Sequence, residues 1–198
     1  MFLLPVCQNI FFPAAGKVDF FRFVLNNEST GTIGTGKEED GMESLDQACM
    51  ERALAEAREA LREGEIPVGA ALYRGSRLLW ADHNRREQRK DPTAHAEMLC
   101  LRHGAEQLSD WRLSGCTLYV TLEPCPMCAG AIAMSRLERC VFAAADPEMG
   151  CCGSVYDLPA DPAFHGHTVW EQGGPAEACR DLLGRCFRPD DEEGGVPE

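Results

Sequence analysis

The chain has 198 residues, 44% of them hydrophobic, and a formal net charge of −13. This length and apolar content favour one globular domain and argue against a second one. The negative charge argues against nucleic-acid binding by the molecule as a whole. Eleven cysteines are an odd and scattered set, and without a secretory signal they favour reduced thiols in the cytoplasm over a disulfide scaffold.

The two ends of the chain differ from its middle. The apolar start lacks a basic leader, contains Pro5 and Pro13, and is shorter than the roughly 20 residues that span a bilayer, so we expect no membrane anchor. A polar, Gly- and Thr-rich segment without helix or strand periodicity follows it. We therefore expect a poorly ordered extension over residues 1–41, a folded domain over 42–188, and an acidic tail over 189–198.

The domain starts with a predicted helix and a predicted hairpin. Residues 42–64 carry apolar side chains at four-residue intervals, and the spacing of Ser44 and Gln47 fits a capping box. Two β-rich runs, 68–74 and 77–82, follow with a Gly-Ser pair between them. This pattern predicts two antiparallel strands joined by a two-residue turn.

A second helix and a buried strand come next. Asp91 is placed to cap the helix, with Pro92 at its first position and Gly104 at its end. Residues 116–122 form a nearly continuous apolar and β-branched run, which is typical of a strand covered on both faces.

The remaining segments continue this alternation. We expect a helix over 125–136, strands over 139–145 and 167–171, and a last helix that begins at Pro175. Strands that alternate with helices indicate an α/β domain with helices on both faces of its sheet.

A Cys-x-x-Cys pair lies in "TLEPCPMCAG", residues 121–130. Taken alone, Cys125 and Cys128 could form a redox couple, half of a structural zinc site, or two ligands of a catalytic zinc. His95 supplies a third ligand and leaves the fourth tetrahedral position to water, as in catalytic zinc sites. Each ligand group falls at a predicted helix start, where the helix dipole favours thiolates.

Glu97 adds the catalytic group that such a site needs. On a helix, His95 and Glu97 would lie about 200° apart, which favours Glu97 as a neighbour of the metal over a fourth ligand. The pattern H-x-E…P-C-x-x-C is the general signature of zinc deaminases. Zinc lowers the pKa of its bound water to about 7, so that hydroxide can attack an amidine-like carbon of a substrate ring near neutral pH. Glu97 would take the proton from that water and pass protons first to the ring nitrogen and then to the leaving amine.

Beyond this signature, residues 45–187 resemble bacterial tRNA-specific adenosine deaminases of the cytidine and deoxycytidylate deaminase superfamily. The resemblance rests on "IPVGAAL" (66–72), "NRREQRKDPTAHAE" (84–97), "TLYVTLEPCPMCAGAI" (117–132), "DPEMGCCGS" (146–154) and the final "FRP". It implies a three-layer cytidine-deaminase-like fold with a mixed sheet of about five strands and one zinc ion per chain. It also implies a homodimer that converts adenosine to inosine at the wobble position of the tRNA anticodon loop, with Asn84 at the flipped base and Asp146 at the flanking nucleotide.

Several alternatives remain open. Asn84 could serve its own backbone, and Asp146 could simply begin a turn. Such deaminases usually end in a basic helix, whereas acidic residues follow Arg188 here, and the basic run 85–90 is the main cationic segment near the site. The rival functions are a deaminase of a free base or nucleoside (guanine, cytosine or adenosine) and a non-catalytic zinc-binding module.

Overall fold

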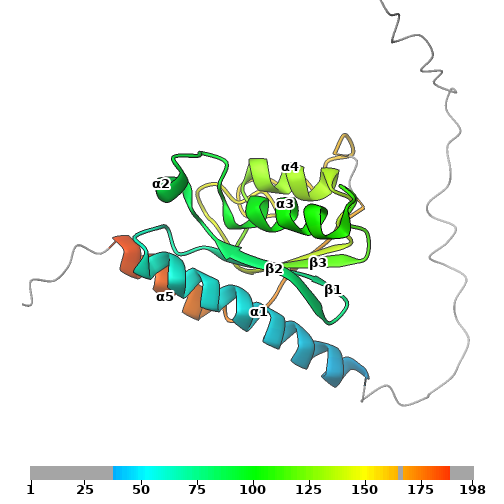
Figure 1. The fold of residues 1–198 in the computed structure, drawn as a ribbon, viewed down its shortest axis with the longest axis horizontal. Helices are drawn as coiled ribbons and strands as arrows, with labels where there is room; N and C mark the ends of the chain where they lie inside the picture. Colours follow the sequence, from blue (N-terminus) through cyan, green and yellow to red (C-terminus); the bar gives the residue numbers. More distant parts are fainter. Residues whose placement is uncertain (1–37, 165–166, 188–198) are drawn as a thin grey trace, which may run out of the picture. The chain divides into compact units, whose positions relative to one another are not determined.

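The computed structural model describes residues 38–164 and 167–187, and over these ranges the chain forms five strands and five helices (Figure 1). The expected acidic tail over 189–198 lies outside the described residues. So does the expected N-terminal extension as far as residue 37. Among the described residues, no helix combines the length and apolarity needed to cross a membrane.

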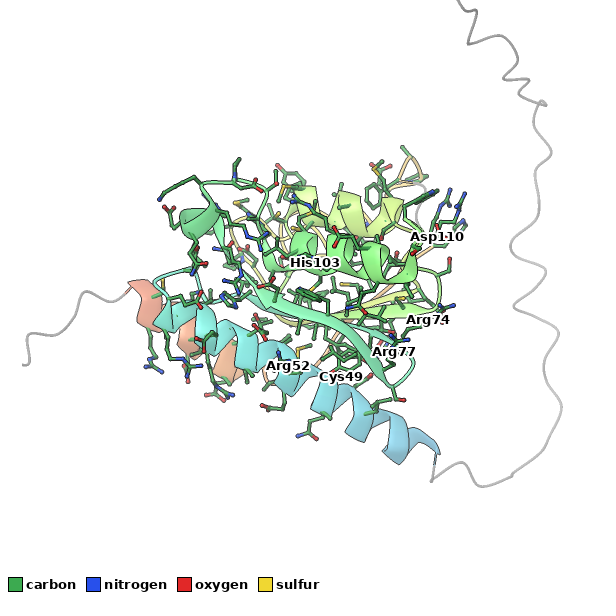
Figure 2. All side chains as sticks on the ribbon, in the orientation of Figure 1. Cys49, Arg52, Arg74, Arg77, His103 and Asp110 are labelled. Carbon is green, nitrogen blue, oxygen red and sulfur yellow. The ribbon has the colours of Figure 1, made fainter. Side chains whose placement is uncertain are left out.

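One mixed sheet has the strand order β2-β1-β3-β4-β5. Its strands are β1 (Gly69–Arg74), β2 (Arg77–His83), β3 (Cys116–Leu122), β4 (Arg139–Ala144) and β5 (Val169–Gln172). Strand β1 pairs antiparallel with β2 and β3, whereas β3, β4 and β5 run parallel. The predicted hairpin is confirmed: Arg74 pairs with Arg77 at its end (Figure 2), and Gly75 takes the positive φ of +59° that the turn requires.

Four helices cover the two faces of the sheet. Helices α1 (Glu38–Arg62) and α5 (Ala176–Phe187) pack on one face, and α3 (Ala96–Leu108) and α4 (Pro126–Met134) pack on the other (Figure 1). A short helix, α2 (Arg86–Arg89), precedes α3. The predicted fold class, a three-layer α/β domain with a mixed five-stranded sheet, is confirmed.

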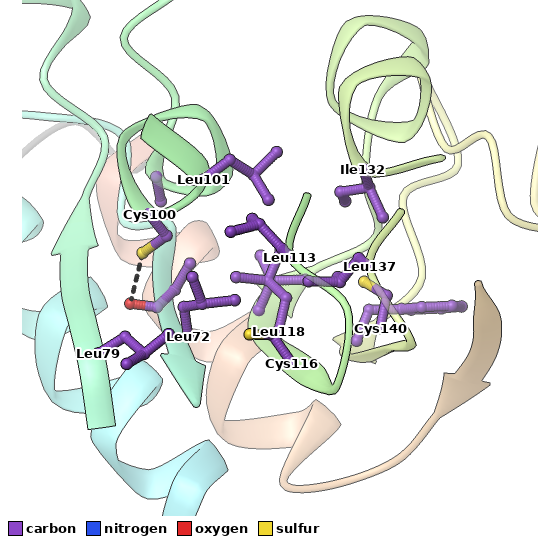
Figure 3. Close-up of a cluster of buried hydrophobic side chains, with 14 residues drawn as sticks. Leu72, Leu79, Cys100, Leu101, Leu113, Cys116, Leu118, Ile132, Leu137 and Cys140 are labelled. Carbon is purple, nitrogen blue, oxygen red and sulfur yellow. Dashed lines mark hydrogen bonds between the residues drawn. The ribbon is translucent and has the colours of Figure 1, made fainter. Parts of the chain in front are cut away.

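The hydrophobic core lies in two layers separated by the sheet. Leu118 of β3 packs with Leu72, Leu101 and other apolar residues in the layer of α3 and α4 (Figure 3). Val120 belongs to the same cluster. Tyr119, between them, packs in the layer of α1 and α5. Strand β3 is therefore buried on both faces, as its composition predicts.

Close packing of α1 on β1 depends on Gly69. A Cβ atom at this position would lie 2.2 Å from the Ala53 carbonyl oxygen and 2.4 Å from the Ala57 nitrogen, both on α1. Glycine therefore lets the helix backbone approach the strand directly.

The predicted start of the first helix is wrong. Helix α1 begins at Glu38 and runs through Ser44, so Ser44 and Gln47 form no capping box at a helix start. Apolar periodicity found this helix, but it did not locate its first turn.

Both predicted ends of the second helix are also wrong. The Asp91 carboxylate accepts hydrogen bonds from the Thr93 N–H (2.8 Å) and hydroxyl (2.7 Å), which makes a local turn, and α3 starts only at Ala96. Gly104 lies inside α3, where an added Cβ would be 2.2 Å from Leu72 Cδ2. Packing against β1 thus explains this glycine better than helix termination.

Candidate active site

Three metal-ligating side chains meet at the N-terminal ends of two helices. His95 is the N-cap of α3 and Cys125 is the N-cap of α4, each in an extended backbone conformation. Cys128 lies in the first turn of α4, which begins at Pro126. The predicted placement of the ligands at helix starts is confirmed.

The spacing of these side chains fits a tetrahedral zinc ion. His95 Nδ1 lies 3.8 Å from Cys125 Sγ and 3.6 Å from Cys128 Sγ, and the donor atoms of all three residues lie within 4.8 Å of one another. Zinc bonds of about 2.0–2.1 Å to nitrogen and 2.3 Å to sulfur would separate tetrahedral ligands by about 3.6 Å. One imidazole and two thiols are also a donor set that suits zinc.

The environment favours a thiolate at Cys125. The pKa of Cys125 is lowered to about 4, first by a hydrogen bond from the Cys128 thiol and then by His95, against the opposing effect of burial. The same hydrogen bond, together with burial, raises the pKa of Cys128. Hydrogen bonding to Cys125 in turn raises the pKa of His95.

Glu97 lies beside this set with its carboxylate buried. Only 4% of the residue is exposed, and Oε2 has no hydrogen-bond partner among the described residues. Burial raises the pKa of Glu97, and His95 acts in the opposite direction. His95 is the N-cap residue and lies outside the regular helix, so the predicted angle of about 200° between His95 and Glu97 around a helix does not apply. Glu97 instead reaches the site from the first turn of α3.

A cavity of about 140 Å³ opens onto these residues. Its polar lining includes His95, Glu97, Cys125, Asn84 and Asp146, so the fold brings five of the six predicted site residues to one cavity. Cys128 lies behind them and is fully buried. The other lining residues are Ile66, Val68, Arg86, Ala96, Leu122, Glu123 and Met149.

A larger cavity of about 680 Å³ lies elsewhere, among α1, β4, β5 and the start of α5. Its cation, Arg139, is already paired with Asp46 and Glu171, and none of the metal-ligating residues lines it. The smaller cavity is therefore the better candidate for the active site.

Asn84 is held by a buried carboxylate. Its Nδ2 donates to Glu65 Oε2 at 3.0 Å, and its backbone N–H donates to the Val68 carbonyl at 2.9 Å. The alternative that the Asn84 side chain serves its own backbone is not what the structure shows. Glu65 Oε1 also accepts the Gln88 N–H at 2.8 Å, which links Asn84 to α2.

Asp146 begins a turn and also lines the cavity. Its Oδ1 accepts hydrogen bonds from the N–H groups of Glu148 (2.9 Å) and Met149 (3.2 Å), so the carboxylate does cap a turn. The residue nevertheless lines the cavity.

Sequence reasoning missed two buried glutamates. Glu65 and Glu123 are 1% and 2% exposed. Glu65 lies three residues before the predicted strand 68–74, and Glu123 directly follows the predicted strand 116–122, which was the available signal for a buried acid. In the basic run, Arg85 pairs with Asp82 and Glu63, whereas Arg86 makes no ion pair within the described ranges. Arg86 lines the cavity and has no acidic partner in the part of the chain that the structure describes.

His95, Cys125 and Cys128 form a metal set. Together with the buried Glu97 carboxylate and the three-layer fold, this metal set defines a zinc-dependent deaminase. The family model of the cytidine and deoxycytidylate deaminase zinc-binding region matches residues 43–144. The tRNA-specific adenosine deaminase of Bacillus subtilis (strain 168) is 43% identical over 143 residues, which cover 72% of this chain and 89% of that one. The chain therefore belongs to the cytidine and deoxycytidylate deaminase family, among the tRNA-specific adenosine deaminases.

Two solved structures are similar to the chain as well. A tRNA:A34 deaminase, studied for A-to-I editing at the wobble position, is 40% identical with a TM-score of 0.62, covering 64% of this chain and 97% of that one. The guanine deaminase of Bacillus subtilis is 27% identical with a TM-score of 0.50, covering 74% of this chain and 96% of that one.

Proposed function

We propose that this protein converts adenosine to inosine at the wobble position of a tRNA anticodon loop by zinc-dependent hydrolysis. The observation that carries the proposal is the convergence of the metal set, buried Glu97 and Asn84 on one small cavity. The relatives named for this activity support the choice of substrate.

The roles of the residues follow from their chemistry. His95, Cys125 and Cys128 would hold the zinc, which supplies Lewis acidity and lowers the pKa of water to about 7. Glu97 accepts a proton from the attacking water and passes it to the ring nitrogen. It then takes the remaining proton of the hydroxyl now bonded to the ring carbon and delivers it to the amine, so that the C–N bond breaks, a carbonyl forms, and adenosine and water become inosine and ammonia. Its raised pKa, a result of burial, suits a carboxylate that must both accept and donate protons.

The dimensions of the cavity fit a single base. At about 140 Å³ it is smaller than the roughly 300–1,000 Å³ pockets that enclose drug-sized ligands. A base turned out of a loop enters such a pocket with little unstacking cost, while its neighbours stay outside. Asn84 would bind the base, and Asp146 would contact the flanking nucleotide at the rim.

Charge near the cavity also bears on an RNA substrate. Arg86 and Arg89 make no ion pair among the described residues and are available for phosphates, whereas Arg85 and Lys90 pair with Asp82 and Glu87. We propose that this local cationic rim offsets the net charge of −13. The homodimer implied by the family resemblance and the cytoplasmic location inferred from the cysteines belong to the same proposal.

A deaminase of free guanine is the second candidate, favoured by the structural similarity to a guanine deaminase. The non-catalytic zinc module is disfavoured, because burying the Glu97 carboxylate costs free energy that a binding module has no reason to spend: Oε2 finds no hydrogen-bond partner among the described residues.

The test is inosine formation in an anticodon stem-loop RNA with a wobble adenosine, run beside free adenosine, guanine and cytosine. The proposal predicts inosine in the RNA and no turnover of the free compounds. Turnover of guanine alone would support the second candidate, and no turnover of any compound by zinc-loaded protein would support the binding module.

A further inference from the structure

The buried side chain of Glu123 has no part in the chemistry described above. It follows β3 directly, two residues before Cys125, and is 2% exposed. Its backbone N–H donates to the Ala144 carbonyl at the end of β4 (2.8 Å), which fixes it between two strands of the sheet.

Within residues 38–164 and 167–187, every hydrogen bond that the Glu123 carboxylate accepts comes from one loop, residues 146–154. Oε1 accepts the N–H groups of Cys152 (2.7 Å) and Ser154 (3.1 Å), and Oε2 accepts the N–H of Asp146 (3.0 Å) and the hydroxyl of Ser154. One carboxylate thus binds both ends of the loop.

The same loop forms one wall of the active-site cavity. Asp146 and Met149 line that cavity; Asp146 is itself bound to Glu123, and Met149 lies between the bound residues Asp146 and Cys152. A further bond, from the Cys151 N–H to the Pro124 carbonyl (3.0 Å), ties the loop to the residue next to the metal ligand Cys125. The segment 123–125 therefore both holds the 146–154 loop and carries the metal ligand Cys125.

Gly150 shows how closely the loop fits the carboxylate. A Cβ atom at Gly150 would lie 2.5 Å from both Cδ and Oε2 of Glu123 and 2.5 Å from the Asp146 carbonyl oxygen. Any larger residue would push the loop away from Glu123.

The ionised form of Glu123 matches these donors. Both oxygens of an ionised carboxylate accept hydrogen bonds, as the loop donors require. A glutamine at position 123 would replace one of these oxygens with an NH₂ group, which cannot accept hydrogen bonds from the loop.

We propose that Glu123 is a positioning residue for the substrate, because it holds the 146–154 loop as the wall against which the target nucleotide is bound. The proposal rests on the proposed function for the identity of the substrate. It predicts that loss of the carboxylate weakens substrate binding and leaves the zinc and Glu97 in place.

The test compares Glu123→Gln and Gly150→Ala with wild type on the anticodon stem-loop. Each variant is expected to raise KM roughly tenfold with kcat within about twofold, at unchanged zinc content. Amide hydrogen exchange of residues 146–154 should accelerate in both variants. Ser154→Ala, which removes only the hydroxyl, should show a smaller effect, and Glu138→Gln, at an exposed glutamate, should match wild type.

Two results would overturn the proposal. One is a fall in kcat that tracks the loss of folded or zinc-loaded protein at constant KM, since this indicates a structural role alone. The other is wild-type exchange of the loop in Glu123→Gln. Failure of the proposed function is seen separately, as a wild-type protein that leaves the RNA unchanged; hydrogen exchange then decides the role of Glu123 without substrate.

Discussion

Gly69→Ala tests how the fold brings α1 onto the sheet. The new Cβ would lie 2.2 Å from the Ala53 oxygen, 2.4 Å from the Ala57 nitrogen and 2.9 Å from Glu56 Cβ, whereas real Cβ atoms essentially never approach within 3.0 Å. The helix must therefore shift by at least about 0.8 Å, because the two closest contacts are with backbone atoms. Overpacking typically costs about 1–3 kcal/mol, and a rigid contact favours the upper end.

The assay is thermal unfolding of the zinc-loaded protein, with Gly130→Ala as the matched control. A loss of about 3 kcal/mol corresponds to a Tm lower by roughly 6–12 °C in a domain of this size. Gly130 lies inside α4 with no atom within 4 Å of an added Cβ, so its replacement should stabilise the protein by about 0.5–1 kcal/mol. Equal Tm values for the two variants would refute the packing argument.

Three further predictions concern stability, binding and the metal. Arg139→Met should cost about 1–2 kcal/mol, a modest loss because its partners Asp46 and Glu171 are partly exposed. The hydrogen bond from Arg139 lowers the pKa of Asp46, so the stabilisation by this ion pair is present above about pH 4 and disappears as the pH falls further. The Tm values of wild type and Arg139→Met should therefore converge in acid. A difference in Tm that stays constant with pH would contradict this prediction. Asn84→Ala should raise KM for the stem-loop roughly tenfold with zinc retained, and an unchanged KM would remove Asn84 from the binding site. Cys128→Ala should lose most of the zinc, as measured by metal analysis, and should unfold at lower temperature; full zinc content would mean that the metal lies elsewhere.

The sequence predicted the elements of the fold better than their ends. Strand 116–122 was found at its observed bounds, because a strand buried on both faces has a composition that few other elements share. The start of α3 was missed because Asp91 and Pro92 fit a helix start and a tight turn equally well. Only tertiary contacts distinguish the two, and Gly104 was misread for the same reason: its role is to let α3 approach Leu72.

The candidate site was predictable where chemistry fixes residue types at fixed spacings. The metal set and Glu97 belong to such a pattern, and the structure brings all four together. Glu65 and Glu123 belong to no such pattern, since their role is to accept hydrogen bonds from segments distant in the sequence. The residues that donate these hydrogen bonds to Glu65 and Glu123 could be identified only from the folded structure.

The central claim is that Glu97 moves protons at a zinc centre held by His95, Cys125 and Cys128. The most direct test measures inosine and ammonia released from the stem-loop by wild type and by Glu97→Gln, both with their zinc content determined. The account predicts equal amounts of inosine and ammonia from wild type, and a rate roughly 10²–10⁴-fold lower from fully zinc-loaded Glu97→Gln. A zinc-loaded variant that turns over at the wild-type rate would contradict it.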